Sequence, residues 1–211
     1  MKKLYILAVT AVLFAATGTA QVKSRNLIVY FSLYGNQTAG TKTDVDSGAS
    51  RIMYDGKIAG NTEAVARMIQ KDAGGDLFAI KMQKPYASAY NDVVSEGKKE
   101  KNEGKYLPVV SKINNIEQYD TIFVGFPTWW YDMPMALYTF FGENDLSGKK
   151  IIPFCTSGGS GFLKTIDAIQ KSAPGAVVEK DGLHVHYKRV AGAQKDVSAW
   201  LRKIGVQKQS D

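Results

Sequence analysis

Two adjacent tryptophans stand in a stretch that has the composition of a loop. The residues PTWWYDMP (127–134) follow directly on an apolar run, TIFVGF (121–126), and include two prolines. At the end of a strand, the indole rings of Trp129 and Trp130 could stack on a flat aromatic ligand, an interaction worth about 1 kcal/mol beyond the area that it buries. The alternative is that both rings close the end of the core, and the two loops described next favour a ligand for at least one ring.

A second stretch, TSGGSG (156–161), combines three glycines with three hydroxyl-bearing residues. Glycines allow the backbone to approach a planar ligand closely, and the N–H and O–H groups of such a loop can donate hydrogen bonds to it. The surrounding sequence fails the G-x-S-x-G nucleophile elbow at its last position and lacks the third glycine of a dinucleotide fingerprint. A flexible turn is the alternative interpretation.

A third group of polar residues surrounds the start of a predicted helix. The loop after the apolar run NLIVYFS (26–32) begins with Ser32 and ends at Asn61 and Thr62, where a helical pattern starts. A helix N-terminus presents unpaired N–H groups and a partial positive charge, which together favour a phosphate. The three polar side chains would add donors, although an ordinary helix cap explains the same residues when they are taken alone.

Other side chains that could react are few. Cys155 lies within an apolar run, so we expect it to be buried, and one cysteine cannot form an internal disulfide framework. His184 and His186 would share one face of a strand, and because a metal site needs three or four ligands we expect two solvent-facing histidines. A serine hydrolase using Ser157 or Ser160 with one of these histidines is an alternative that lacks an acidic partner.

Apolar runs predict the strands that would position these loops. Three continuous runs cover residues 26–32, 121–126 and 150–156, and weaker ones cover 76–82 and 176–185. Such runs without strict alternation are typical of strands that are buried on both faces of a parallel sheet.

Helical patterns alternate with these runs, at residues 61–75, 86–104, 134–143, 161–175 and 191–205. This alternation predicts a single α/β domain, a three-layer sandwich. Ligands of an open parallel sheet bind beyond the carboxyl ends of the strands, where the three unusual loops are expected to lie. The connection at about 33–59 is too long for this alternation and is expected to be functional or disordered.

The first twenty residues have the layout of a secretory signal peptide. A positive MKK precedes the apolar LYILAVTAVLFAA, and small residues lead to Ala20. The apolar run is shorter than the about 20 residues of a spanning helix. We therefore expect residues 1–20 to be cleaved, leaving a periplasmic or secreted domain, residues 21–211, with no stable membrane span. The net charge of +7 is spread along the chain rather than clustered, so a nucleic-acid partner is not expected.

Three segments, IVYFS…GNTEAVA, YDTIFVGFPTWWYDMP and PFCTSGGSGF, resemble the flavodoxin family, and the resemblance covers residues 27–204. The chain is most similar to a bacterial flavodoxin-like branch with an enlarged loop after the first strand. The resemblance implies a doubly wound, five-stranded parallel sheet in the order 2-1-3-4-5 with bound flavin mononucleotide (FMN); flavodoxin is itself a standard example of this order and of FMN at its switch point.

The resemblance also assigns roles by position. It implies that the phosphate is held by Ser32, Asn61 and Thr62, that the isoalloxazine ring is lined by Pro127, Thr128, Trp129 and Trp130, and that the ring edge and ribityl chain contact Thr156, Ser157, Gly158, Gly159, Ser160 and Gly161. Two departures follow from the sequence. The long loop interrupts the phosphate motif, so Tyr34 or Thr38 could contribute donors. The loop at 156–161 has no aromatic residue, so one flavin face is expected to be open or covered by RIMYDG (51–56).

Electron transfer through the flavin is the leading functional hypothesis. The protein would act as a carrier for a redox partner protein or as a reductase of a small acceptor such as a quinone. Because nicotinamide cofactors are cytosolic, an exported reductase would receive its electrons from another protein or from the membrane. Whether the chain is an enzyme stays open; as an enzyme it would be an FMN-dependent oxidoreductase. A flavin-binding protein without redox turnover is the alternative from another class.

Overall fold

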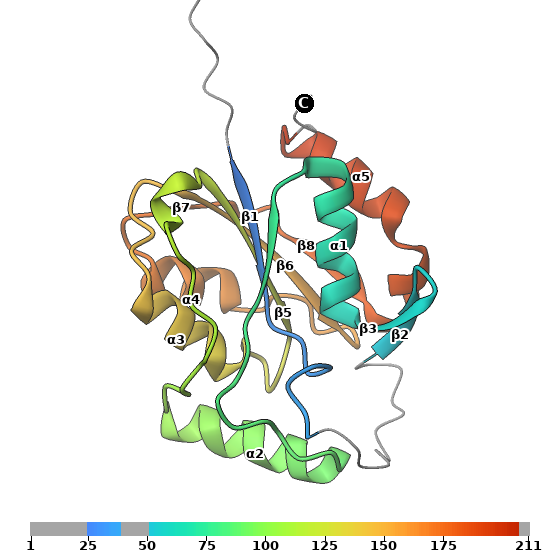
Figure 1. Cartoon of the computed structure of the whole chain (residues 1–211), viewed down its shortest axis with the longest axis vertical. Helices are drawn as coiled ribbons and strands as arrows, with labels where there is room; N and C mark the ends of the chain where they lie inside the picture. Colours follow the sequence, from blue (N-terminus) through green and yellow to red (C-terminus); the bar gives the residue numbers. More distant parts are fainter. Residues whose placement is uncertain (1–24, 39–50, 207–211) are drawn as a thin grey trace, which may run out of the picture.

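A central sheet of six parallel strands carries the loops that the sequence singles out (Figure 1). Across the sheet the order is β4 (Asp76–Ala79), β1 (Asn26–Tyr30), β5 (Thr121–Pro127) and β6 (Lys150–Ser157), followed by β7 (Val177–Val178) and β8 (Leu183–His186). Strand β7 pairs with the start of β6 and β8 with its end, so the two short strands share one position. Counted along the chain, the order is 2-1-3-4-5, which confirms the predicted topology.

The computed structural model describes residues 25–38 and 51–206. The predicted signal peptide, residues 1–20, lies outside the described residues, and so do residues 39–50 of the long loop. Among the described residues, no helix is both long enough and apolar enough to cross a membrane.

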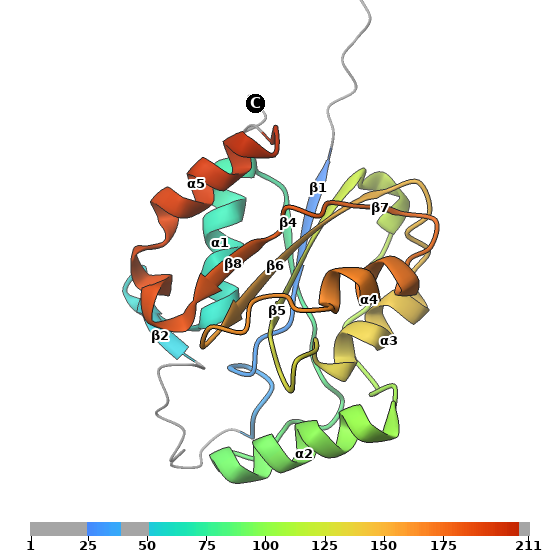
Figure 2. The same ribbon diagram turned by 180° about the vertical axis from the view of Figure 1, so that it is seen from behind.

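Two pairs of helices cover the faces of the sheet (Figures 1 and 2). Helices α1 (Asn61–Ala73) and α5 (Gln194–Lys203) lie on one face, and α3 (Met135–Glu143) and α4 (Thr165–Ser172) lie on the other. Short 3₁₀ helices, η1 (Ile116–Gln118) and η2 (Tyr187–Gly192), complete the connections. Because both faces are covered, all five residues of β1 are buried, as the continuous apolar run predicted.

Helix α2 (Tyr90–Glu103) departs from the three layers. It lies beyond the carboxyl ends of the strands, at the bottom of Figures 1 and 2, and buries only Val93 and Gly97. The chain after β4 runs past the edge of the sheet and pairs with the loop after β1, where Tyr86 N–H donates to the carbonyl of Asn36 at 2.8 Å. The helix therefore begins only after the chain has passed the carboxyl ends of the strands.

The buried amide of Asn36 ties these two segments together. Its Nδ2 donates to the carbonyls of Ser32 (2.8 Å) and Ile80 (2.9 Å), and its Oδ1 accepts from the N–H of Met82 at 2.8 Å. One side chain therefore satisfies backbone groups from the loops that follow β1 and β4. The position of α2 depends on this connection.

Part of the long loop is an ordered hairpin. Strands β2 (Arg51–Tyr54) and β3 (Lys57–Gly60) pair antiparallel and lead directly into α1. Asp55 and Gly56 both have positive φ angles, 51° and 72°, as a tight two-residue hairpin turn requires. Ile52 and Tyr54 pack against the core beneath α1 and α5.

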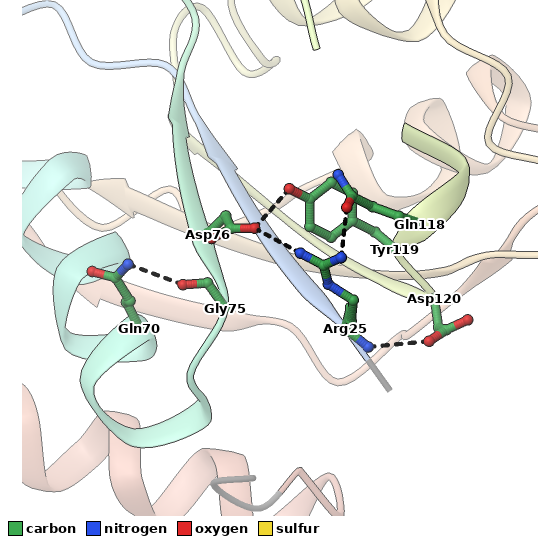
Figure 3. Close-up of polar contacts among 7 residues, drawn as sticks. All are labelled: Arg25, Gln70, Gly75, Asp76, Gln118, Tyr119 and Asp120. Carbon is green, nitrogen blue, oxygen red and sulfur yellow. Dashed lines mark hydrogen bonds and ion pairs between the residues drawn. The ribbon is translucent and has the colours of Figure 1, made fainter. Parts of the chain in front are cut away.

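The amino ends of the strands are joined by a polar network (Figure 3). Arg25 contacts Gln118 at 2.6 Å and Asp76 at 3.6 Å, and Tyr119 O–H donates to Asp76 at 2.7 Å. The Arg25 and Asp76 side chains are more than half exposed, so their ion pair contributes only about 0–1 kcal/mol. The amino ends of the strands are thus held together by local contacts between neighbouring strands. The predicted ligand-binding loops lie at the opposite, carboxyl ends.

We expect Asn36→Ala to lower the free energy of unfolding by about 2–4 kcal/mol, because three backbone groups lose a buried partner. Urea denaturation of the variant measures this loss. Gln37→Ala is the matched control, because the neighbouring amide makes one long bond, 3.3 Å, to the carbonyl of Ala87. Equal losses in the two variants would contradict the role of Asn36.

Candidate functional site

A cavity of about 520 Å³ opens at the carboxyl ends of β5 and β6. This volume is within the range of about 300–1,000 Å³ that is usual for small-molecule sites. Its walls come from the loop after β1, helix α2, the loops after β5 and β6, and η2. The lining residues are Leu33, Tyr90, Val93, Val94, Gly97, Pro127, Thr128, Trp129, Trp130, Thr156, Ser157, Gly158 and Tyr187. Seven of the predicted site residues are among them, and none of the lining residues carries a charge.

Trp129 belongs both to the core and to the cavity wall. Its ring meets those of Phe31 and Tyr86 edge to face, with centroid distances of 5.6 and 5.4 Å. The residue is half-buried and also lines the cavity. The two interpretations offered by the sequence, a core ring and a ligand-contacting ring, are therefore compatible at this position.

Trp130 is held against α2 in a strained turn. Trp130 and Tyr131 have φ angles of 51° and 65°, and the turn is closed by two backbone bonds between Trp129 and Asp132, at 2.8 and 2.9 Å. Left-handed backbone costs a bulky residue roughly 1–2 kcal/mol. The Trp130 indole N–H donates to the carbonyl of Val94 at 3.0 Å, which fixes the ring on the helix.

Gly97 allows α2 to approach this turn. A Cβ atom at Gly97 would lie 3.4 Å from the ring of Trp129, closer than most such contacts. A glycine inside a helix costs about 0.5–1 kcal/mol relative to alanine, so its presence here is explained by the close approach. The same helix is tied further by Tyr86, whose O–H donates to Glu100 at 2.8 Å, and by Lys101, which donates to the carbonyl of Trp130.

The loop after β6 is wrapped around the hydroxyl of Ser157. The Ser157 Oγ accepts the N–H groups of Gly159 (3.2 Å) and Gly161 (3.1 Å), and it lies 2.8 Å from Nε2 of His184. Thr128 joins this loop to the neighbouring one, because its Oγ1 donates to the carbonyl of Gly161 at 2.8 Å. Among the six predicted residues of this loop, Thr156, Ser157 and Gly158 line the cavity, while Gly159, Ser160 and Gly161 do not.

The Ser157–His184 contact does not make a hydrolase site. Both lone pairs of the Ser157 oxygen are used by backbone N–H groups, so none is free to attack a carbonyl. Ser157 is only 9% exposed. His184 and His186 are both half-buried, which corrects the expectation of two solvent-facing residues. The pKa of His184 is lowered from 6.5 by burial and then by the nearby His186.

Cys155 is fully buried, as predicted, and burial raises the pKa of its thiol to about 12. A thiol with such a pKa stays protonated at neutral pH and is a poor nucleophile. Among the residues that the structure describes, no group of three or more histidine, cysteine or acidic side chains could hold a metal ion.

The three predicted phosphate residues meet at the start of α1. Asn61 and Thr62 are each 2% exposed, and Thr62 Oγ1 lies 2.9 Å from Thr156 Oγ1, on the cavity wall. A Cβ atom at Gly60 would lie 1.8 Å from the Ser32 hydroxyl, so Ser32 contacts the helix start directly. None of the three lines the large cavity itself, and Thr62 reaches its wall only through Thr156.

Ser32 itself lines a second, smaller cavity of about 310 Å³, together with Tyr34, Glu63 and Lys81. Glu63 brings a negative charge into the first turn of α1, where its Oε2 accepts the N–H of Gly60 at 3.3 Å. The Arg67 guanidinium lies 2.8 Å from the same carboxylate and offsets this charge. The repulsion that Glu63 would exert on a phosphate near the start of α1 is therefore reduced.

Sequence reasoning missed Tyr187 and the contribution of α2. The rings of Tyr187 and His186 stack with their centroids 4.8 Å apart. A Cβ atom at Gly158 would lie 3.6 Å from the Tyr187 ring. Tyr187 supplies the aromatic side chain that the loop at 156–161 lacks. The segment RIMYDG (51–56) does not line the cavity, because its hairpin packs against the core beneath α1. One sequence signal was available for α2: Gly97, a glycine inside a predicted helix, indicates that this helix passes close to another part of the chain.

Comparisons with known proteins support the fold. Comparison with curated protein sequences gave no significant match. Two solved structures, from Bacteroides eggerthii and Bacteroides uniformis and both assigned as flavoproteins, are 28% and 25% identical, each with a TM-score of 0.66. The alignments cover 87% of this chain and 99% of the first protein, and 85% and 98% for the second.

A flavoprotein from Lactobacillus acidophilus, solved in complex with FMN, is 16% identical over 84% of this chain and 98% of its own, with a TM-score of 0.58. At this identity the likeness supports the fold alone. A family profile described as Flavodoxin matches residues 52–204, well over half of the 211-residue chain. The chain belongs to the flavodoxin family.

Proposed function

We propose that this protein binds FMN at the carboxyl edge of its sheet and transfers electrons through it. The observation that carries the proposal is an uncharged cavity with aromatic walls, one of whose lining residues, Thr156, contacts Thr62 at the N-terminus of α1. Such a site has an apolar end for a ring and a donor-rich end for an anion. Family membership and the FMN-bound relative support the same cofactor.

Each part of the site has a role in holding the cofactor. The flat ring would lie between α2, at Val93 and Gly97, and the loops at Trp129 and Gly158. The phosphate would be held by N–H groups at the start of α1. FMN, when bound, supplies the reversible uptake and release of electrons, and the protein binds it, orients it and excludes water.

Positive charge borders the cavity. The ammonium group of Lys98 lies 5.1 Å from the centre of the Trp130 ring, and that of Lys188 lies 5.9 Å from the centre of the Tyr187 ring. Both rings line the cavity, and the chain without residues 1–20 would carry +5, because cleavage removes only Lys2 and Lys3 from the total of +7. These cations favour a negatively charged redox partner protein. A small acceptor such as a quinone is the other acceptor that we propose, and the positive charge does not select it.

Export is part of the proposal, because a chain that begins with a cleavable signal peptide would work in the periplasm or outside the cell. Mass spectrometry of the protein recovered from the periplasmic fraction tests this point. A mature N-terminus at Gln21 supports it, whereas a protein recovered from the cytoplasm with residues 1–20 intact contradicts it.

We expect purified protein to bind one equivalent of FMN and to become yellow, with quenching of the flavin fluorescence. Riboflavin, which lacks the phosphate, should bind more weakly if the start of α1 holds an anion. Fluorescence titration with both ligands measures the two dissociation constants. A protein that stays colourless in excess FMN would refute the proposed function.

We expect Gly97→Leu to weaken FMN binding about tenfold or more, which corresponds to 1.4 kcal/mol, because the new side chain enters the cavity against Trp129. Gly142→Leu is the matched control, since Gly142 lies in α3 and a Cβ atom there would meet only Tyr106, at 3.7 Å. Glycine 97 is a cleaner probe than Trp129, whose removal would also damage the core. Equal affinities in both variants would mean that α2 does not contact the flavin.

The rate of flavin reoxidation distinguishes an electron-transfer protein from a flavin-storage protein. A carrier or a reductase, once chemically reduced, should be reoxidised rapidly by a suitable acceptor in a stopped-flow experiment. A storage protein should hold its reduced flavin when it is mixed with quinones or with oxidised redox proteins. The second outcome would leave FMN binding intact and remove the electron-transfer part of the proposal.

A further inference from the structure

His184 does not line the cavity but contacts a residue, Ser157, that does. It lies on β8, beside the end of β6, and its Nε2 contacts the Ser157 hydroxyl at 2.8 Å. Ser157 lines the cavity, whereas His184 does not. Any effect of His184 on a ligand must therefore pass through Ser157 and its loop.

The hydrogen bonds around Ser157 fix the protonation state of His184. A serine hydroxyl has one proton to donate and two lone pairs to accept. Both lone pairs are used by the N–H groups of Gly159 and Gly161. The hydroxyl proton must then be donated to Nε2 of His184, so the imidazole is neutral and carries its own proton on Nδ1.

Protonation of His184 breaks this arrangement. A proton taken up from solvent at Nε2 would present a third donor to an oxygen that can accept only two. At least one loop N–H, from Gly159 or Gly161, must then lose its partner, and the Ser157 hydroxyl must turn to another acceptor. The loop from 157 to 161 would change conformation at the wall of the cavity.

The surroundings of His184 favour the neutral form. His186 lies on the same strand and is the one charged or titratable neighbour, among the described residues, that acts on it. Cys155, its register partner on β6, is buried and protonated, and Gly161 packs against the ring. Burial, followed by the field of His186, lowers the pKa of His184 below 6.5.

We propose that His184 is a positioning residue that holds residues 157–161 in the flavin-binding conformation through Ser157, and that its protonation weakens flavin binding. The inference rests on the proposed function. Because burial lowers the pKa of His184 in the folded protein, the residue is neutral and the loop is closed at neutral pH. The loop opens as the pH falls through this lowered pKa. Folding stability begins to fall at a higher pH, about 6.5, where His184 of the unfolded chain takes up the proton.

A titration of the flavin-free protein by NMR tests the loop directly, from pH of about 8 to about 5. We expect the amide signals of Gly159 and Gly161 to move with the same midpoint as the His184 ring. In His184→Gln, whose amide oxygen can still accept the Ser157 proton, these movements should disappear. His186→Gln is the matched control and should keep them. Amides that do not respond, or that respond equally in His184→Gln, would overturn the inference.

Fluorescence titration with FMN tests the coupling to the ligand. We expect the dissociation constant of the wild type to rise about three- to tenfold on acidification, the effect of losing one hydrogen bond. The FMN phosphate, with a second pKa of about 6, adds a pH dependence that is common to all variants. The measured quantity is therefore the pH dependence of the FMN dissociation constant in the wild type compared with that in His184→Gln and in Ser157→Ala. The same pH dependence in all three proteins would overturn the coupling between His184 and flavin binding.

The two proposals fail in different ways. Absence of FMN binding at every pH would refute the proposed function, and the NMR titration would still decide whether His184 controls the loop. Tight FMN binding with the same pH profile in the wild type and in His184→Gln would leave the proposed function intact and refute the role of His184.

Discussion

Burial of the central strands on both faces decides where this molecule can do chemistry. The side chains of β1, β5 and β6 are almost all enclosed between the two pairs of helices, so these central strands offer no room for a ligand on either face. Polar groups that are not paired within the sheet can be placed only at its edges. At the amino edge, Arg25, Asp76 and Tyr119 pair with one another, whereas the carboxyl edge keeps a cavity. Parallel strands thus concentrate loops from distant parts of the chain at one place.

Helix α2 turns this edge into an enclosed site. In Figures 1 and 2 it lies across the end of the sheet rather than on a face. Asn36 fixes the chain that leads to it, and Gly97 and Trp130 fix its distance from the loop after β5. The cavity therefore has a wall whose position is set by these polar and glycine contacts in addition to the packing of the strands.

Most of the fold could be predicted from the sequence, and the site only in part. Continuous apolar runs identify the strands because burial on both faces leaves no other pattern. The position of α2 could not be predicted, because it depends on the polar bonds of Asn36 and not on periodicity. The hairpin at 51–60 was not predicted, although Asp55–Gly56 is a typical pair for a two-residue hairpin turn. Tyr187 was missed because its place at the cavity depends on contacts with segments far away in the sequence. A pairing of Ser157 with a histidine was raised only as part of a hydrolase site, because the sequence does not show the backbone N–H groups that hold the Ser157 hydroxyl.

The strained turn explains how such a site can be ready for a ligand. Trp130 and Tyr131 adopt left-handed backbone, which is unfavourable for both residues. The Asp132 carboxylate offsets this, because its Oδ1 accepts from the N–H of Met133 at 2.8 Å and from the O–H of Tyr138 at 3.0 Å. The turn is thus held by the folded protein before any ligand arrives, and the ordering of its aromatic rings does not have to be supplied by binding. A flat ring that enters the cavity would meet walls already in place, which favours tight binding from a modest number of contacts.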